Sequence, residues 1–137
     1  MKKGNIQKLS KNFNRKEFSC KCGCGQDTVD YRLIIILEEL HEQYDQIYGE
    51  CFVKVTSGNR CKEHNARTRG SSPNSGHITG KGVDIQIYYY ESSSRVYIET
   101  HYIYEYLTKK YPNSYGIIKH DDFIHIDVKN RKYHKVI

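Results

Sequence analysis

Two histidines and an aspartate stand in a pattern that can bind a metal ion. His77 and Asp84 lie on either side of a glycine-containing run, and His125 comes later in the chain. Two imidazole nitrogens and one carboxylate oxygen suit Zn²⁺, and three protein ligands leave a coordination position open for water. The pattern therefore predicts a catalytic rather than a structural zinc site, with His77, Asp84 and His125 as ligands.

Two further acids lie beside His125. Asp122 comes three residues before it, where a metal-dependent hydrolase needs a general base that takes a proton from water. Asp127 comes two residues after it, so on a strand the two side chains would point to the same face. We predict Asp122 as the base, and Asp127 as a residue that orients the site or, alternatively, as the base itself.

The elements that must position these residues follow from the spacing of apolar side chains. Apolar residues recur every three or four positions from Asp30 to Tyr48, which predicts a helix with Asp30 as its N-cap and Gly49 at its end. The other predicted elements are strands at 52–57 and 83–88, a helix at 95–110, and a hairpin of strands at 115–119 and 123–128. This order predicts an α+β domain with a small antiparallel sheet and flanking helices.

The chain has the length of one domain. Residues 1–12 are polar and are expected to form a flexible N-terminal arm, and residues 13–137 a single domain. Residues 59–76, just before His77, are rich in Ser, Gly, Asn and Arg and predict a long functional loop. The histidines outside the ligand set are expected at the surface or in packing; they include His41, His101, His120 and His134.

Five cysteines leave three interpretations open. They are Cys20, Cys22, Cys24, Cys51 and Cys61. The run from 20 to 24 can belong to a structural zinc site, although zinc-binding cysteines are more often separated by two to four residues. It can instead form a disulfide with Cys61 if the protein works outside the cell, or remain as free thiols in a reducing cytosol.

The net charge of +6 and a pI of about 9.0 fit attraction to a polyanion, or simply a basic surface. Lysines and arginines are scattered and no nucleic-acid-binding motif occurs, so nucleic acid is not expected as a partner, whereas an anionic cell wall fits. No apolar run is long enough to predict a transmembrane segment, and the basic N-terminus lacks the apolar stretch of a signal peptide.

Several motifs together resemble the M15 zinc peptidases, which include D-alanyl-D-alanine carboxypeptidases, D,D-dipeptidases and phage endolysins. The resemblance is specific because the motifs occur together, and it covers about residues 13–128. The motifs are the cysteine run from Glu17 to Gly25, Ser57-Gly58-Asn59-Arg60, His64-Asn65, Ser75-Gly76-His77, Gly80-Lys81-Gly82-Val83-Asp84-Ile85 and Phe123-Ile124-His125-Ile126-Asp127-Val128. The small phage-associated branch of these peptidases is the most similar.

This resemblance implies a fold like that of the hedgehog and D-Ala-D-Ala peptidases, and the same three zinc ligands. It also implies that Arg60 stabilises the oxyanion at the scissile carbonyl. Ser75 matches a position that binds the substrate, although an ordinary loop or cap serine is an equal alternative. Many M15 enzymes carry an acid at the position of Asp122, whereas the phage-associated branch often lacks one.

The implied function is zinc-dependent hydrolysis of peptide bonds in bacterial peptidoglycan, as a D-Ala-D-Ala carboxypeptidase or an endolysin-type endopeptidase. A monomer is expected, made in the cytoplasm and acting at the cell wall after a phage-type release. The alternative is a non-catalytic zinc-containing module that binds the cell wall or a protein. A nucleic-acid-binding domain held by the cysteines is a weaker alternative, because it leaves the pattern of His77, Asp84 and His125 unexplained.

Overall fold

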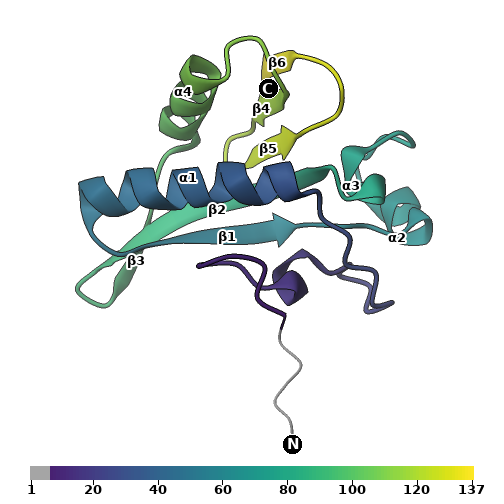
Figure 1. The fold of residues 1–137 in the computed structure, drawn as a ribbon, viewed down its shortest axis with the longest axis horizontal. Coiled ribbons are helices and arrows are strands. Elements are labelled where there is room, and N and C mark those ends of the chain that lie inside the picture. The colour runs from purple at the N-terminus through teal and green to yellow at the C-terminus, as the bar shows by residue number, and fades with distance from the viewer. Residues whose placement is uncertain (1–6) are drawn as a thin grey trace, which may run out of the picture.

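A mixed β-sheet with helices packed against it forms the described part of the chain, residues 7–137 of a computed structural model (Figure 1). The helices are the 3-10 helix η2 (Arg15–Phe18), α1 (Tyr31–Tyr48), α2 (Lys62–Arg67), α3 (Gly76–Thr79) and α4 (Thr100–Lys110). The strands are β1 (Cys51–Ser57), β2 (Gly82–Glu91), β3 (Ser94–Tyr97), β4 (Gly116–Lys119), β5 (Ile124–Asp127) and β6 (Tyr133–Val136). The α+β class predicted from the sequence is confirmed.

The strands are ordered β1-β2-β5-β4-β6, and β3 pairs with the second half of β2. The named strands pair antiparallel except β4 with β6, so the prediction of an antiparallel sheet is wrong at this edge. The reason is the short connection after β5. That strand ends at Asp127 beside Gly116, the first residue of β4, and the chain starts β6 at Tyr133, also beside Gly116. A strand that starts at the same end of the sheet as β4 must run parallel to it.

The helix predicted from residue 95 begins only at Thr100, because residues 94–97 form β3. A tight turn with Ser92 in the left-handed region (φ 57°) folds the chain back onto β2. The Arg95 guanidinium then lies 4.0 Å from the centre of the Tyr88 ring. Cross-strand contacts of this kind stabilise a sheet and here override the helical spacing.

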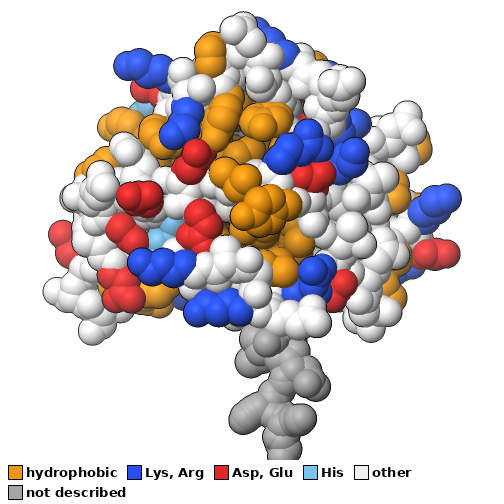
Figure 2. All heavy atoms as spheres, viewed as in Figure 1, with side chains coloured by type: hydrophobic (Ala, Val, Ile, Leu, Met, Phe, Trp, Pro, Cys, Tyr) orange, Lys and Arg blue, Asp and Glu red, His pale blue; other side chains and the backbone are white. Residues whose placement is uncertain are grey.

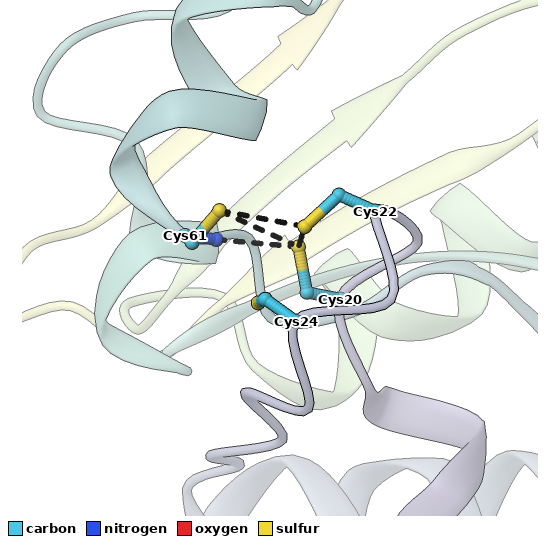
Figure 3. A group of neighbouring side chains, drawn as sticks. All are labelled: Cys20, Cys22, Cys24 and Cys61. Atoms are coloured by element: carbon cyan, nitrogen blue, oxygen red, sulfur yellow. Dashed lines mark hydrogen bonds between the residues drawn. The ribbon is translucent and has the colours of Figure 1, made fainter.

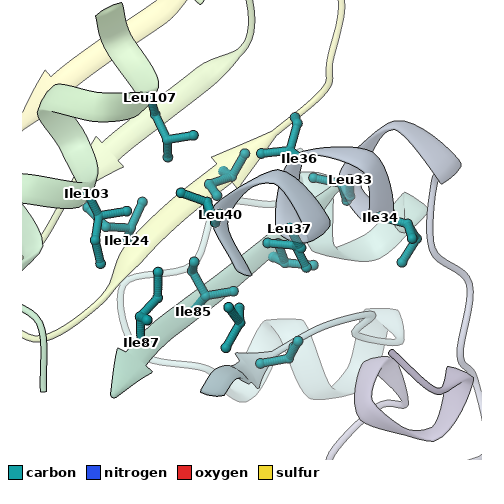
Figure 4. Packing of buried hydrophobic residues seen from close by; sticks show 14 of the residues in the cluster. Leu33, Ile34, Ile36, Leu37, Leu40, Ile85, Ile87, Ile103, Leu107 and Ile124 are labelled. Carbon is teal, nitrogen blue, oxygen red and sulfur yellow. The ribbon is translucent and has the colours of Figure 1, made fainter. Parts of the chain in front are cut away.

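The long helix α1 has the bounds that its sequence predicts. The Asp30 side chain accepts a hydrogen bond from the backbone N–H of Arg32, and Gly49 follows the helix at φ 82°. Its apolar face covers one face of the sheet. Side chains from α1, β2, α4 and β5 meet in one hydrophobic cluster (Figure 4), which includes Leu33, Leu37, Leu40, Ile85, Ile87, Ile103, Leu107 and Ile124. Ile47, which continues the apolar spacing of this helix, is instead exposed.

Residues 1–6 of the predicted arm lie outside the described residues. The rest of the arm contacts α1: the backbone N–H of Asn12 donates to Glu38 Oε2 at 2.8 Å. In the described part of the chain, no helix has the length and apolar character needed to cross a membrane. Figure 2 shows apolar side chains gathered over the N-terminal end of α1 and above it, acidic side chains over much of the rest of this helix, and basic side chains in several separate places on this face.

Candidate metal centre

The alternation of β2 and β5 places the predicted ligands on the sheet face opposite the hydrophobic core. Val83, Ile85 and Ile87 of β2 belong to the core, so Asp84 between them points to the other face. On β5 the same alternation separates Ile124 and Ile126 from His125 and Asp127. Asp84 and His125 are register partners on adjacent strands, which makes them direct neighbours.

His77 reaches the same place from the short helix α3. The Ser75 hydroxyl accepts a hydrogen bond from the His77 backbone N–H at 3.1 Å, which caps this helix. Asn59, which is buried, donates from Nδ2 to the His77 carbonyl at 2.7 Å and accepts from the Thr28 backbone N–H. The helix that carries His77 is thus fixed by a cap on one side and by a buried amide on the other.

Three donor atoms converge. Asp84 Oδ1 lies 2.9 Å from His125 Nδ1 and 3.2 Å from His77 Nε2, and all three atoms lie within 4.8 Å of one another. Zinc bonds of about 2.0–2.1 Å in tetrahedral geometry separate neighbouring N and O ligands by roughly 3.3 Å. The residues present therefore fit a zinc ion held by two imidazoles and one carboxylate, as the sequence predicted.

The outer nitrogen of each ring is hydrogen-bonded in a way that turns the inner one toward the metal position. His77 Nδ1 lies 2.7 Å from the Gly58 carbonyl, and His125 Nε2 lies 3.0 Å from Asp127 Oδ2. Both partners only accept, so these outer nitrogens carry protons, and in a neutral ring the inner nitrogen is then the one that offers a lone pair to a metal. Lone pairs and a carboxylate directed at one point repel unless a cation lies among them.

The electrostatics of the site favour a positive charge. Burial opposes charge on His125, but the carboxylates of Asp127 and Asp84 outweigh it and raise the pKa of His125 to about 9. Burial would also raise the pKa of Asp84, yet the two imidazoles beside it hold that pKa well below its usual range. The carboxylates that stabilise a proton on His125 would equally stabilise a metal cation that replaces this proton.

Asp127 lies against the outer nitrogen of His125, as expected of a residue that orients this ring. Its side chain is buried, contacts His125, and accepts from Arg131 Nη2 at 3.0 Å. Burial raises the pKa of Asp127, but His125 and Arg131 lower it by more. The net effect is a lowered pKa, so the carboxylate is ionised. A β-carbon added at Gly116, its register partner on β4, would collide with this carboxylate. Gly116 therefore leaves the space that Asp127 occupies.

The ligands open into a cavity of about 780 Å³ whose lining includes Arg60 and Ser75. Arg60 is buried, and its Nε and Nη1 have no hydrogen-bond partner among residues 7–137. Burial lowers the pKa of this guanidinium, although Asp84 and Cys20 oppose that effect. Buried donors without partners are costly, so this guanidinium is suited to a carbonyl or carboxylate of a bound molecule.

The structure separates Asp122 from the cavity lining and adds His120 to it. Asp122 lies on an exposed turn, where its backbone carbonyl accepts from Gln86 Nε2 at 2.8 Å. His120 lines the cavity, and burial lowers its pKa, while Asp84 acts in the opposite direction. Sequence reasoning missed His120, because a histidine in a polar turn carries no signal of where that turn packs.

One of three comparisons with known proteins finds a match. A sequence model of the family described as peptidase M15 matches residues 11–127, which include every residue of the site named above except Arg131. No curated protein matches the chain, and no solved structure does.

Proposed function

Because the chain belongs to the peptidase M15 family, whose members are zinc-dependent metallopeptidases, we propose that it hydrolyses peptide bonds of bacterial cell-wall peptidoglycan. The observation that carries this proposal is the convergence of the His77, Asp84 and His125 donor atoms at a cavity that also contains the unpartnered guanidinium of Arg60. Three ligands beside an accessible cavity favour an enzyme over a non-catalytic zinc-containing module.

Zinc held by these residues would lower the pKa of a water molecule and polarise the scissile carbonyl. Arg60 donates hydrogen bonds to the oxygen of that carbonyl as negative charge develops on it. Asp127 keeps the His125 ring in place, and Gly58 does the same for His77. These groups are positioned before substrate arrives, so little reorganisation is needed during the reaction.

A proton must leave the attacking water and reach the leaving amine. We propose His120 for this step, because it lines the cavity and its lowered pKa keeps the imidazole neutral near pH 7. Asp122, the base predicted from the sequence, stays a prediction that the same experiments test. The alternative role of Asp127 is disfavoured because both of its carboxylate oxygens already accept hydrogen bonds.

The cavity also suits the chemistry of the proposed substrate. Besides Arg60, its lining includes the basic side chains of Arg69, Lys129 and Arg131. Stem peptides of peptidoglycan carry free carboxylates, which such a lining attracts. We therefore propose a D-Ala-D-Ala carboxypeptidase or an endolysin-type endopeptidase of the phage-associated branch, made in the cytoplasm and acting at the cell wall.

Purified full-length protein, assayed on peptidoglycan fragments, tests this function. Released D-alanine would indicate a carboxypeptidase, and new amines on larger fragments an endopeptidase. His77→Ala should abolish the release, whereas His101→Ala, which removes a half-exposed imidazole on α4, should leave it unchanged. Zinc-loaded protein that leaves every fragment intact would overturn the proposal and favour the non-catalytic binding module.

A further inference from the structure

A second group of metal-ligating side chains lies outside the cavity. Cys20, Cys22 and Cys24 come from the segment after η2, and Cys61 comes from the start of α2. Their four sulfur atoms lie within 4.8 Å of one another, and Figure 3 shows three of the sulfurs facing one another across the two segments. The fifth cysteine, Cys51, is buried in the hydrophobic core instead.

The distances between the sulfur atoms are too long for disulfide bonds in this structure and match a shared metal ion. Cys20 Sγ lies 3.4 Å from Cys22 Sγ and 3.9 Å from Cys61 Sγ, and the latter two are 3.6 Å apart. A disulfide needs about 2.05 Å. Four thiolates around zinc at about 2.3 Å are separated from one another by roughly 3.8 Å. The three distances lie on both sides of this value.

The backbone of residues 20–25 is folded so that alternate side chains converge. In an extended strand, alternate residues are about 6.6 Å apart along the chain, which keeps their side chains from meeting at one point. Here Gly23 and Gly25 adopt φ of 85° and 89°, and the Gly23 N–H donates to the Cys20 carbonyl at 3.2 Å. These turns explain how a Cys-x-Cys-x-Cys run can supply three ligands to one ion.

Backbone donors already surround the sulfurs. The Cys61 N–H donates to Cys20 Sγ at 3.4 Å, and the His64 N–H donates to Cys61 Sγ, also at 3.4 Å. The second of these bonds makes Cys61 the N-cap of α2. Donors of this kind stabilise the negative charge of metal-bound thiolates and hold them in orientation.

We propose that Cys20, Cys22, Cys24 and Cys61 bind a second zinc ion, and that this ion has a structural role. Four thiolates fill all tetrahedral positions and leave none for water, as in structural zinc sites. None of the four cysteines lines the cavity. The proposal does not depend on peptidase activity, because it rests on the sulfur geometry alone.

This ion would join two segments that are separated by about 40 residues and both support the cavity. Cys61 directly follows Arg60, and the segment of Cys20 continues from Phe18, whose carbonyl accepts from the Asn59 backbone N–H at 2.8 Å. The zinc would therefore hold the loop that carries Arg60 against the core-anchored N-terminal segment. Its expected effect on the reaction is the positioning of Arg60.

Metal content measured by elemental analysis tests the proposal directly. We expect two zinc ions per chain in the full-length protein, one in Cys24→Ser and one in His77→Ala. Cys51→Ser is the matched control: it also removes one thiol, which here donates to the Tyr44 carbonyl, and it should keep two. In cobalt-substituted protein, thiolate-to-metal charge-transfer absorption should persist in His77→Ala and disappear in Cys24→Ser.

Alkylation of the unmodified protein gives a second test that does not require a variant to fold. Cys22 and Cys24 are exposed, so as free thiols they would react at once with iodoacetamide. If they bind zinc, mass spectrometry should find both unreacted until a chelator is added. Immediate alkylation of zinc-loaded protein, a disulfide among the four cysteines, or a single zinc that is lost only in His77→Ala would each overturn the proposal.

Discussion

The two groups of metal-ligating side chains differ in donors, support and access. The first group offers nitrogen and oxygen ligands and opens into a cavity of about 780 Å³. Its members are His77, Asp84 and His125, and the last two lie on paired strands. The cysteines offer four sulfurs from two loop segments and lie outside that cavity. Donor number and setting thus favour our proposal of chemistry at the first group and of a structural role for the second.

Arg60 connects the two groups. It lines the cavity, and its guanidinium is affected electrostatically by both Asp84 and Cys20. Its backbone N–H donates to the His77 carbonyl at 2.9 Å, while the next residue, Cys61, belongs to the sulfur group. A structural ion can therefore support a reactive one without sharing a ligand with it, and variants in each group should separate the two roles.

Asp84→Asn should have the largest effect, and that effect should be confined to the first group. The substitution keeps the shape of the side chain but removes the anion between the two imidazoles. We expect loss of zinc from this site and a fall in activity of at least ~10³-fold, because several kcal/mol of transition-state stabilisation depend on the metal. Zinc per chain and hydrolysis rate measure this. Loss of both zinc ions would show that the two groups are not independent.

His120→Gln should reduce kcat by roughly 10²–10⁴-fold while zinc remains bound, because it removes the proposed proton acceptor. Asp122→Asn is the comparison variant and should have little effect. If instead Asp122→Asn shows the large loss and His120→Gln does not, the base predicted from the sequence is the correct one.

The pH dependence of the same reaction follows from the pKa of His120, which burial lowers from 6.5. A base must be unprotonated to act, so its function is present above its pKa and is lost as the pH falls through it. We expect the acid limb of the wild-type pH–rate profile to lie below pH 6.5, with zinc content constant across it. An acid limb above pH 6.5 would contradict this assignment.

Asp127→Asn should weaken metal affinity or activity by about 10–100-fold, since it changes the hydrogen-bond partner of a ligand rather than a ligand. Competition with a chelator measures the affinity of the first site. The sulfur group should retain its zinc throughout. An unchanged affinity would show that the His125 ring is held by the sheet alone.

Ser75→Ala should have the smallest effect and decides between the two roles considered for this serine. Loss of the cap on the helix that carries His77 should lower the free energy of unfolding by about 1 kcal/mol, measured by denaturant titration. If the hydroxyl also binds substrate, KM rises as well. Unchanged stability with a raised KM would assign the residue to substrate binding only.

Local signals predicted much of the fold. Apolar spacing and caps gave the bounds of α1, and alternation gave β1, β2 and the hairpin of β4 and β5. The prediction failed where distant contacts outweigh local preference. Residues 94–97 joined β2 as β3, β6 paired with β4 in parallel, and the polar loop predicted at 59–76 contains α2 and ends at the first residue of α3. Neither these two strand pairings nor the helix in the loop leaves a recognisable pattern within its own segment.

The sequence alone determined which residue types could bind metal, since the chemistry of imidazole, carboxylate and thiolate does not depend on the fold. The residue spacing also sufficed to nominate His77, Asp84 and His125. Only the tertiary structure brought His120 into the cavity and left Asp122 on an exposed turn. The sequence offered Cys61 only as one possible disulfide partner of the cysteine run, and the tertiary structure placed its sulfur within 4.8 Å of the other three. These outcomes depend on sheet register and on chain segments meeting across the core, which no local pattern encodes.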